Sequence, residues 1–370
     1  MWLRYERKNM YFCPLRVPVW SRIIMYMRTA VVILNLNTVD YLRSFVPGIL
    51  ASIGEDDRLF VADSGSTDES LTFLEREYPQ VGRIPLGKNY GFAEGYDRAL
   101  AQISDAEYYL LLNSDVEVGG DWLSALVSFM ESHPRAAVCG PKLHALDRAG
   151  DKWVRTDRFE YAGAAGGFVD HYGYPFCRGR VLSRVEQDHG QYDEPCKVFW
   201  ITGACLMIRA QVWRDLGGLD ADYFAHMEEI DLCWRAQLLG YEVWCVPQSV
   251  VWHIGGGTLA PASAFKLKLN YRNSIWTLEK NLPASIGPSR ARRRIFLRKC
   301  IDGLSALAYL LTLRPAYFKA VVNAHREASE KPQRPSHATA QVRIPKVRII
   351  VASLLHGKKV FSYISKTIKV

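Results

Sequence analysis

From about residue 29, apolar runs alternate along the chain with stretches of helical periodicity. Runs rich in β-branched residues predict strands over residues 29–36, 58–62 and 108–116. Helices are predicted between and after them, over residues 42–50, up to residue 78, up to residue 100 and over 122–130. This β-α-β-α-β succession is typical of an α/β fold with a parallel sheet and right-handed connections.

Polar side chains stand where two of these strands end. Asp63 follows the second strand, and the triplet Asn113, Ser114 and Asp115 ends the third. Open α/β sheets bind ligands beyond the carboxyl ends of their strands, so we expect both aspartates at a nucleotide-binding edge. A carboxylate there suits a hard cation such as Mg²⁺ or Mn²⁺, which makes Asp115 a candidate metal ligand. For each aspartate the alternative is an ordinary turn residue.

Two loops carry further signals. Ser66 and Glu69 have the spacing of a capping box for the helix that runs to residue 78. The loop at 86–92 contains Lys88 and Asn89 between glycines, which allow close approach of a ligand, and Lys88 is a candidate phosphate-binding residue. A solvated loop is the alternative.

The second half of the chain begins with a segment that lacks a pattern. Residues 145–200 show no clear period and are predicted as an irregular insertion that contacts an acceptor, with a surface loop as the alternative. The pattern then predicts a strand over 201–208, a helix over 226–239, strands over 242–246 and 250–253, and a long helix over 264–282.

The predicted helix at 226 begins with a cluster of acidic residues. Glu228, Glu229 and Asp231 suit a helix N-terminus, and Asp231 can pair with Arg235 one turn later. Clustered acids raise one another's pKa, so one glutamate is a candidate proton acceptor while the other has a structural role. His253 ends a strand before three glycines and is a candidate metal or phosphate ligand, with a core or surface histidine as the alternative.

Charge is unevenly distributed along the 370 residues. The net charge of +9 combines +5 in residues 1–28, −11 in residues 29–289 and +15 in residues 290–370, where 18 basic residues face 3 acidic ones. An acidic middle with a basic tail indicates an enzyme tethered to an anionic partner and not a nucleic-acid-binding protein. RNA binding is the competing use of a basic tail, and it is less favoured because the tail lacks a regular interleaving of aromatic with basic residues.

The tail has two short apolar segments flanked by arginine and lysine, at residues 301–313 and 347–355. Such segments fit amphipathic helices at an anionic membrane surface. No segment approaches the length of a membrane span, and the eight scattered cysteines indicate reduced thiols in a cytosolic protein. The expected organisation is a disordered or mis-annotated lead (1–28), a catalytic domain (29–285) and a basic helical tail (286–370).

An ordered set of motifs within residues 29–282 resembles the family 2 glycosyltransferases of GT-A fold, most closely the bacterial rhamnosyltransferase type. The motifs are VVILNLNTVDYL, VADSGSTDES, GKNYGFAEGYDRAL, LLNSDV, TGACLMIRA, GGLDADYFAHMEEIDLCWRAQLLGYEVWCVP, VVWH and YRN. The resemblance implies a Rossmann-like nucleotide-diphospho-sugar transferase domain.

The resemblance also implies roles for individual residues. Asp63 would read a uracil or thymine ring, Asp115 and His253 would hold the metal, and Glu229 would be the catalytic base with Glu228 as the competing assignment. The further candidates are Asn35, Asn37, Lys88, Asn89 and Asn113 for the nucleotide, and Gly203, Asp231 and Trp252 as acceptor-binding or supporting residues. The chain departs from the family pattern twice: the DXD-type motif has one carboxylate, and the base is Glu in place of Asp.

The implied function is an inverting transfer that depends on Mg²⁺ or Mn²⁺. A sugar, with rhamnose as the first expectation, would pass from a UDP- or dTDP-sugar to a hydroxyl of a growing, lipid-linked cell-surface glycan at the cytoplasmic face of the membrane. One base and no nucleophile on the enzyme imply a single displacement. The alternatives are a nucleotidyltransferase, which needs no base beside an acceptor, and a nucleotide- or glycan-binding pseudoenzyme.

Overall fold

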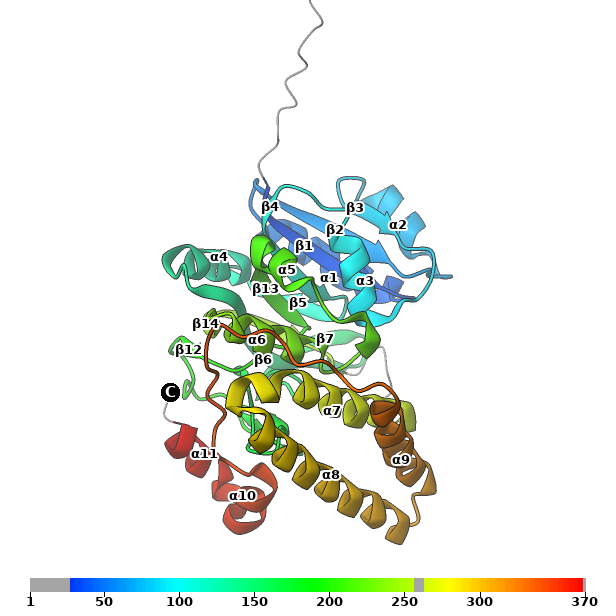
Figure 1. Ribbon diagram of the computed structural model, residues 1–370. Coiled ribbons are helices and arrows are strands. Elements are labelled where there is room, and N and C mark those ends of the chain that lie inside the picture. Colours follow the sequence, from blue (N-terminus) through cyan, green and yellow to red (C-terminus); the bar gives the residue numbers. More distant parts are fainter. Residues whose placement is uncertain (1–26, 256–262, 369–370) are drawn as a thin grey trace, which may run out of the picture.

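The structure is a computed structural model that describes residues 27–255 and 263–368 (Figure 1). The expected N-terminal lead therefore lies almost entirely outside the described residues. The strands are β1 (Met27–Asn35), β2 (Asp57–Asp63), β3 (Gly82–Pro85), β4 (Ala106–Asn113), β5 (Val116–Val118), β6 (Ala136–Ala149), β7 (Lys152–Phe159), β8 (Gly167–Val169), β9 (Pro175–Cys177), β10 (Arg180–Val181), β11 (Arg184–Val185), β12 (Cys196–Lys197), β13 (Cys205–Arg209) and β14 (Glu242–His253). The helices are α1 (Val39–Ser52), α2 (Ser70–Glu77), α3 (Gly91–Leu100), α4 (Trp122–Ser132), α5 (Ala210–Leu216), α6 (Glu228–Leu238), α7 (Ala264–Ile286), α8 (Pro288–Leu311), α9 (Pro315–Glu330), α10 (Ile349–His356) and α11 (Val360–Ile368).

A ten-stranded mixed sheet forms the centre of the catalytic region, with strand order β12-β14-β6-β13-β4-β1-β2-β3 and with β5 and β7 at its side. Successive residues of β1 point to opposite faces: Val31 and Ile33 pack with α1 and α4, whereas Ala30 and Val32 pack with the core that includes α3, α5 and α6. Both faces are therefore covered, which explains why the strands read as continuous apolar runs.

The predicted parallel half of the sheet is confirmed. β1 runs parallel to β2 and β4, and β2 runs parallel to β3. The register pairs Asn35 with Asp63 and places Asn113 beside Leu34, so three polar strand ends meet at one edge. The mixed α/β architecture followed by a helical region agrees with the fold expected from the sequence.

The prediction that residues 145–200 are irregular is wrong. β6 continues to Ala149 and pairs with β7, and β8 to β11 form a separate four-stranded antiparallel sheet. The strands β8 to β12 are only two or three residues long, and β7 is exposed on both faces over most of its length, so no period reveals them.

Two local predictions also need correction. The capping box is absent, because helix α2 starts at Ser70 after Glu69, and the Ser66 hydroxyl instead accepts hydrogen bonds from Asn35 and from the Asn37 backbone. The strand expected over residues 201–208 starts only at Cys205, because a turn closed by the Cys205 N–H and the Thr202 carbonyl precedes it.

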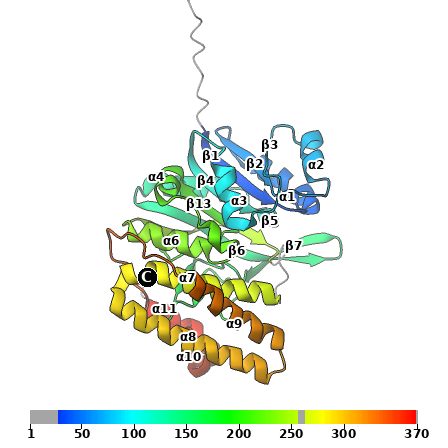
Figure 2. The same ribbon diagram turned by 45° about the vertical axis from the view of Figure 1, so that its right-hand side comes forward.

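The C-terminal region consists of helices that cover the lower end of the molecule in Figures 1 and 2. α7, α8 and α9 pack against one another, and the two apolar tail segments lie largely in α8 and α10. Among the described helices, none is long and apolar enough to cross a membrane. The seven described cysteines are free, and six of them are buried.

Candidate active site

A cavity of about 320 Å³ opens at the carboxyl edge of the parallel strands. Eight of the residues singled out in the sequence line it: Asn35, Asn89, Asn113, Asp115, Gly203, Glu228, Glu229 and His253. They come from β1, from the loop before α3, from the end of β4 and the turn after it, from the turn before β13, from α6 and from β14. The fold therefore gathers residues spread over more than half of the chain.

Asp115 and His253 meet because β14 runs antiparallel to β5. The register pairs His253 with Val116, the residue after Asp115. His253 Nε2 lies 3.1 Å from Asp115 Oδ1, and both side chains are buried. Burial alone would lower the pKa of His253, but the carboxylates of Asp115 and Glu160 raise it to about 10. The two carboxylates therefore favour a positive charge at the His253 ring.

Glu160 is a site residue that the sequence patterns did not indicate. Its Oε2 accepts hydrogen bonds from the backbone of Ala162 and Gly163, and its Oε1 lies 3.5 Å from His253 Nδ1. A carboxylate behind the second ring nitrogen is typical of a histidine that binds a metal through the first. Glu160 lies in the segment that has no period, so only its charge between apolar neighbours could have drawn attention.

The Asp115–His253 pair fits a divalent cation whose remaining coordination positions are filled by the substrate. Among the described residues no group of three or more His, Cys, Asp or Glu could hold a metal by itself. Mg²⁺ in phosphate-transfer sites commonly takes one or two protein ligands and fills its shell with phosphate oxygens and water. Asp115 Oδ1 and His253 Nε2 suit that arrangement.

The segment before α6 has an unusual backbone. Phe224, His226 and Met227 have φ values of 63°, 71° and 76°, which residues other than glycine rarely adopt. Asn273 Nδ2 lies within 3.0 Å of the carbonyl oxygens of Tyr223, Ala225 and His226. This asparagine of the YRN motif on α7 therefore holds the strained segment that leads to the glutamates.

Glu228 and Glu229 differ in protonation although both line the cavity. Each has one buried carboxylate oxygen without a hydrogen-bond partner. Burial raises the pKa of Glu229 to about 7. Burial and then the Glu229 charge raise the pKa of Glu228 well above its ordinary value. Near neutral pH, Glu229 is the member of the pair that can release and accept a proton.

Lys266 is a second site residue that was not predicted. It is the only lysine or arginine among the described residues that line the cavity, and it lies in the first turn of α7. Burial lowers its pKa, and Glu160 offsets this in part. A cation in the first turn of a helix is unfavourable next to the helix dipole, which was an available signal that Lys266 serves a ligand.

Three predicted nucleotide-site residues do not line the cavity. Asp63 is buried and accepts hydrogen bonds from Asn35, from Gly65 and from Ser66, so it joins the loops after β1 and β2. Asn37 is exposed and accepts hydrogen bonds from the residue 67 and 68 backbone. The Lys88 ammonium lies 4.7 Å from the centre of the Tyr90 ring. Their roles toward a nucleotide stay predictions.

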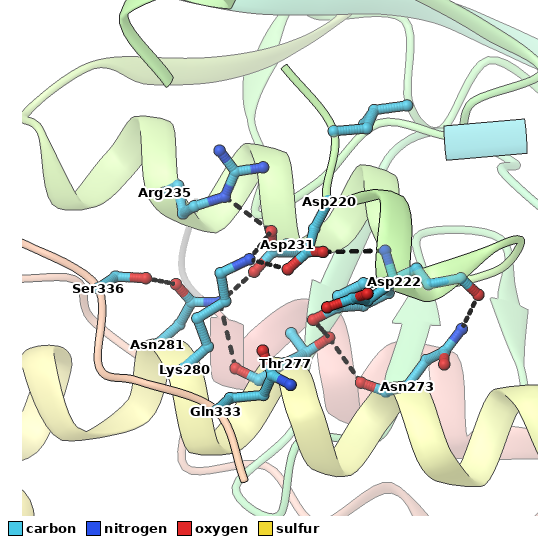
Figure 3. A network of polar contacts seen from close by, with 12 residues as sticks. Asp220, Asp222, Asp231, Arg235, Asn273, Thr277, Lys280, Asn281, Gln333 and Ser336 are labelled. Atoms are coloured by element: carbon cyan, nitrogen blue, oxygen red, sulfur yellow. Dashed lines mark hydrogen bonds and ion pairs between the residues drawn. The ribbon is translucent and has the colours of Figure 1, made fainter. Parts of the chain in front are cut away.

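Asp231 and Trp252 also lie away from the cavity wall. Figure 3 shows Asp231 between α6 and α7, where it pairs with Arg235 and Lys280 and accepts a hydrogen bond from Asn281. Trp252 donates its indole N–H to a backbone carbonyl and stacks under the Arg155 guanidinium. The expectation that Asp231 and Trp252 bind an acceptor or support the site therefore stays a prediction.

Comparison with known proteins agrees with this geometry. The family model "Glycosyl transferase family 2" matches residues 30–217, just over half of the chain. The chain is 26% identical over 223 residues to an N-acetylglucosaminyl-diphospho-decaprenol L-rhamnosyltransferase of Mycobacterium tuberculosis, covering 58% of this chain and 71% of that protein. It is 23% identical to the rhamnosyltransferase WbbL of Escherichia coli K12, covering 59% and 80%.

Solved structures show the same fold at low identity. Staphylococcus aureus TarS 1–349 in complex with UDP-GlcNAc matches with a TM-score of 0.52 at 13% identity, over 92% of this chain and 88% of that chain. GalNAc-T7 with UDP, GalNAc and Mn²⁺ matches with a TM-score of 0.54 at 16% identity, over 69% of this chain and 48% of that chain. These likenesses identify the GT-A fold. By its family match the chain belongs to the family 2 glycosyltransferases, enzymes that transfer a sugar from a nucleotide-sugar donor.

Proposed function

We propose that the protein is an inverting, metal-assisted glycosyltransferase that uses a UDP- or dTDP-sugar. The observation that carries the proposal is one cavity in which the Asp115–His253 pair lies together with two glutamates whose buried oxygens lack partners. Sugar transfer needs both parts: positive charge at the departing diphosphate and a base at the attacking hydroxyl.

In this proposal Asp115 and His253 hold Mg²⁺ or Mn²⁺, with Glu160 fixing the orientation of the imidazole. The bound cation would neutralise charge on the leaving diphosphate. The Lys266 ammonium adds a second positive charge on the α7 side of the cavity. Glu229 accepts the proton of the acceptor hydroxyl as that oxygen attacks the anomeric carbon. With no covalent intermediate, the anomeric configuration is inverted.

The finer substrate assignment is rhamnose transfer to a lipid-linked glycan at the cytoplasmic face of the membrane. It is supported by the names of the M. tuberculosis and E. coli relatives, one of which specifies a diphospho-decaprenol acceptor. Asp63 remains our candidate for reading the pyrimidine ring: it adjoins cavity residues Asn35 and Ser64, and carboxylate oxygens can each accept more than one hydrogen bond.

The test is thermal unfolding in the presence of UDP, dTDP, GDP or CDP, each with and without Mn²⁺. A ligand that binds only the folded state stabilises it by about 2.7 kcal/mol at a hundredfold excess over its Kd. We expect a metal-dependent shift with UDP or dTDP that is lost in Asp115→Ala. A shift only with GDP or CDP would refute the pyrimidine-dione assignment, and no shift with any nucleotide would refute the proposed donor site.

A further inference from the structure

The end of α8 and the turn into α9 expose a cluster of leucines. The exposed fractions are 68% for Leu304, 48% for Leu307, 45% for Leu310, 75% for Leu311 and 89% for Leu313. Positions 304, 307 and 311 recur at helical spacing, so these side chains form one stripe on the helix. Residues 303–313 contain no charged residue. We call this segment the apolar tip. Single exposed apolar residues are ordinary, but a contiguous patch of this kind marks an interaction surface.

A second exposed apolar group lies on α10. Leu354 is 80% exposed, Leu355 is 75% exposed and Val351 is 46% exposed. In both views α8 and α10 lie at the end of the molecule farthest from β1, β2 and β3 (Figures 1 and 2). The two exposed groups thus belong to the same end of the protein.

The charges around these groups are almost all positive. Arg314 and Lys319 are exposed directly after the apolar tip, and Lys346 and Arg348 are exposed before α10. The exposed basic residues have little acidic compensation in the tail. Of its three acidic residues, Asp302 is buried against Arg298 and Glu327 pairs with Lys268 and Arg272, which leaves Glu330 at the surface.

The apolar tip lies at the cavity end of the α7–α8 pair. The two helices are antiparallel, and Arg298 Nη2 donates to the Ser274 hydroxyl at 2.8 Å. The end of α8 that carries the apolar tip therefore lies on the same side of this contact as the first turn of α7, where Lys266 lines the cavity. Phe265, beside it on the first turn of α7, is 47% exposed.

We propose that the apolar tip and α10 dock on an anionic lipid surface and hold the α7 side of the cavity next to the bilayer. The leucines enter the interface between headgroups and acyl chains, and the flanking arginines and lysines pair with lipid phosphates. A second copy of this chain is a poorer occupant, because two tails of +15 repel each other. Docking on lipid does not depend on the proposed function. Only the idea that docking brings the cavity to a lipid-linked acceptor rests on that function.

The experiment is co-sedimentation of the full chain with vesicles of phosphatidylcholine, with and without phosphatidylglycerol, in the absence of nucleotide and sugar. We expect binding that requires the anionic lipid and that weakens by at least about tenfold in the triple variant Leu304→Ser, Leu307→Ser, Leu311→Ser. Val154→Ser, at a valine that is 42% exposed on β7, is the matched control and should bind as the wild type does.

Fold and oligomeric state are checked on the same samples by thermal unfolding and light scattering. These exposed leucines should be replaceable without loss of folding. The proposal is overturned if the wild-type protein does not bind anionic vesicles. It is also overturned if the folded triple variant binds them as well as the wild type does. A wild-type dimer that the triple variant converts to a monomer, with vesicle binding unchanged, assigns the surface to a second copy instead. Since no nucleotide is present, these outcomes are independent of the donor-site test.

Discussion

The neighbouring residues Glu228 and Glu229 differ in how strongly their surroundings raise the pKa of the carboxyl group. Both are acids in the first turn of α6, but the negative charge of Glu229 makes ionisation of Glu228 less favourable and so raises the pKa of Glu228 further. Glu229 titrates near neutrality, and backbone N–H groups of the first turn partly offset its burial. A general base is most effective when its pKa lies near the working pH, which favours Glu229.

We therefore predict a pH-dependent rate that a single substitution removes. The base must be ionised, so kcat should rise with pH up to about 7, the pKa of Glu229, and level off above it. Glu229→Gln should lower kcat by about 100- to 10,000-fold with the nucleotide-induced thermal shift unchanged. Glu228→Gln replaces a protonated carboxyl by a neutral group and should have a much smaller effect. Loss of turnover in Glu228→Gln and its retention in Glu229→Gln would move the base to Glu228.

A second prediction concerns the carboxylate behind His253. In Glu160→Gln the remaining oxygen is needed by the backbone of Ala162 and Gly163, so the amide N–H₂ turns toward His253 Nδ1. His253 Nδ1 must then accept a hydrogen bond from this amide, so the ring proton lies on Nε2, the atom that faces Asp115. Mn²⁺ affinity, measured by titration calorimetry with UDP or dTDP present, should fall about 10- to 100-fold. Glu279→Gln, on α7 and outside the cavity, is the control; equal Mn²⁺ affinity in both variants would contradict the positioning role.

At the residue scale, most of the cavity-lining residues that could be predicted lie at or next to the ends of strands and helices. Asp115 and His253 were predictable because each ends a strand, where side chains face the ligand edge. Glu160 follows an exposed hairpin in a segment without a period, so no pattern indicated it. Lys266 was overlooked although its place in the first turn of a helix was an available signal, and the packing that brings both residues to the site is long-range. Asp63 was noted for its position, but its hydrogen bonds to the β1 and β2 loops appear only in three dimensions.

At the scale of elements, α7 fixes the geometry of the segment that leads into α6. The strained backbone from Phe224 to Met227 persists because Asn273 donates to two of its carbonyl oxygens and to that of Tyr223 just before it. We predict that Asn273→Ala lowers stability by about 1–3 kcal/mol and lowers kcat more than it raises KM for the donor. Asn270→Ala, which removes a bond only to the Lys266 carbonyl, should leave kcat near the wild-type value. Equal kcat and KM values in the two variants would show that the hydrogen bonds of Asn273 to this segment are unimportant for catalysis.

The ion-pair network in Figure 3 joins the first turns of α6 to the C-terminal half of α7. Burial alone would raise the pKa of Asp231, but Arg235 and Lys280 lower it below its ordinary value. Its stabilising contribution is therefore complete above the pKa of an unfolded aspartate and is lost as the pH falls through the lower, folded value. We predict that Asp231→Asn lowers the free energy of unfolding by about 3–5 kcal/mol at neutral pH and that its stability changes less on acidification.

Chemical denaturation at several pH values measures both effects. The control is Asp222→Asn, which removes an exposed pair with Lys331 and should cost less than about 1 kcal/mol. If Asp231→Asn were no less stable than Asp222→Asn, the network would not be what anchors α6 to α7.

The same scale explains which elements the sequence could predict. Strands covered by helices on both faces give long apolar runs, so β1, β2 and β4 were located within a few residues. β7 is largely exposed and β8 to β11 are very short, so they leave no periodic signal, and their pairing is set by contacts with β6 and with one another. The acids at the start of α6 were ambiguous in the sequence, because a helix N-terminus and a catalytic base both favour acidic residues there.

At the scale of the whole molecule, the net charge is −11 in residues 29–289 and +15 in residues 290–370. If the tail holds the enzyme on an anionic bilayer, transfer to a lipid-linked acceptor in vesicles should weaken with added salt, because exposed charges are screened within about 8 Å at physiological ionic strength. Transfer to a short-chain, water-soluble acceptor should change little over the same salt range, since the buried Asp115–His253 pair is screened far less. The Leu304→Ser, Leu307→Ser, Leu311→Ser variant should be slow with the vesicle acceptor and normal with the soluble one. Parallel salt profiles for the two acceptors would show that the tail does not deliver the enzyme to its substrate, even if it binds lipid.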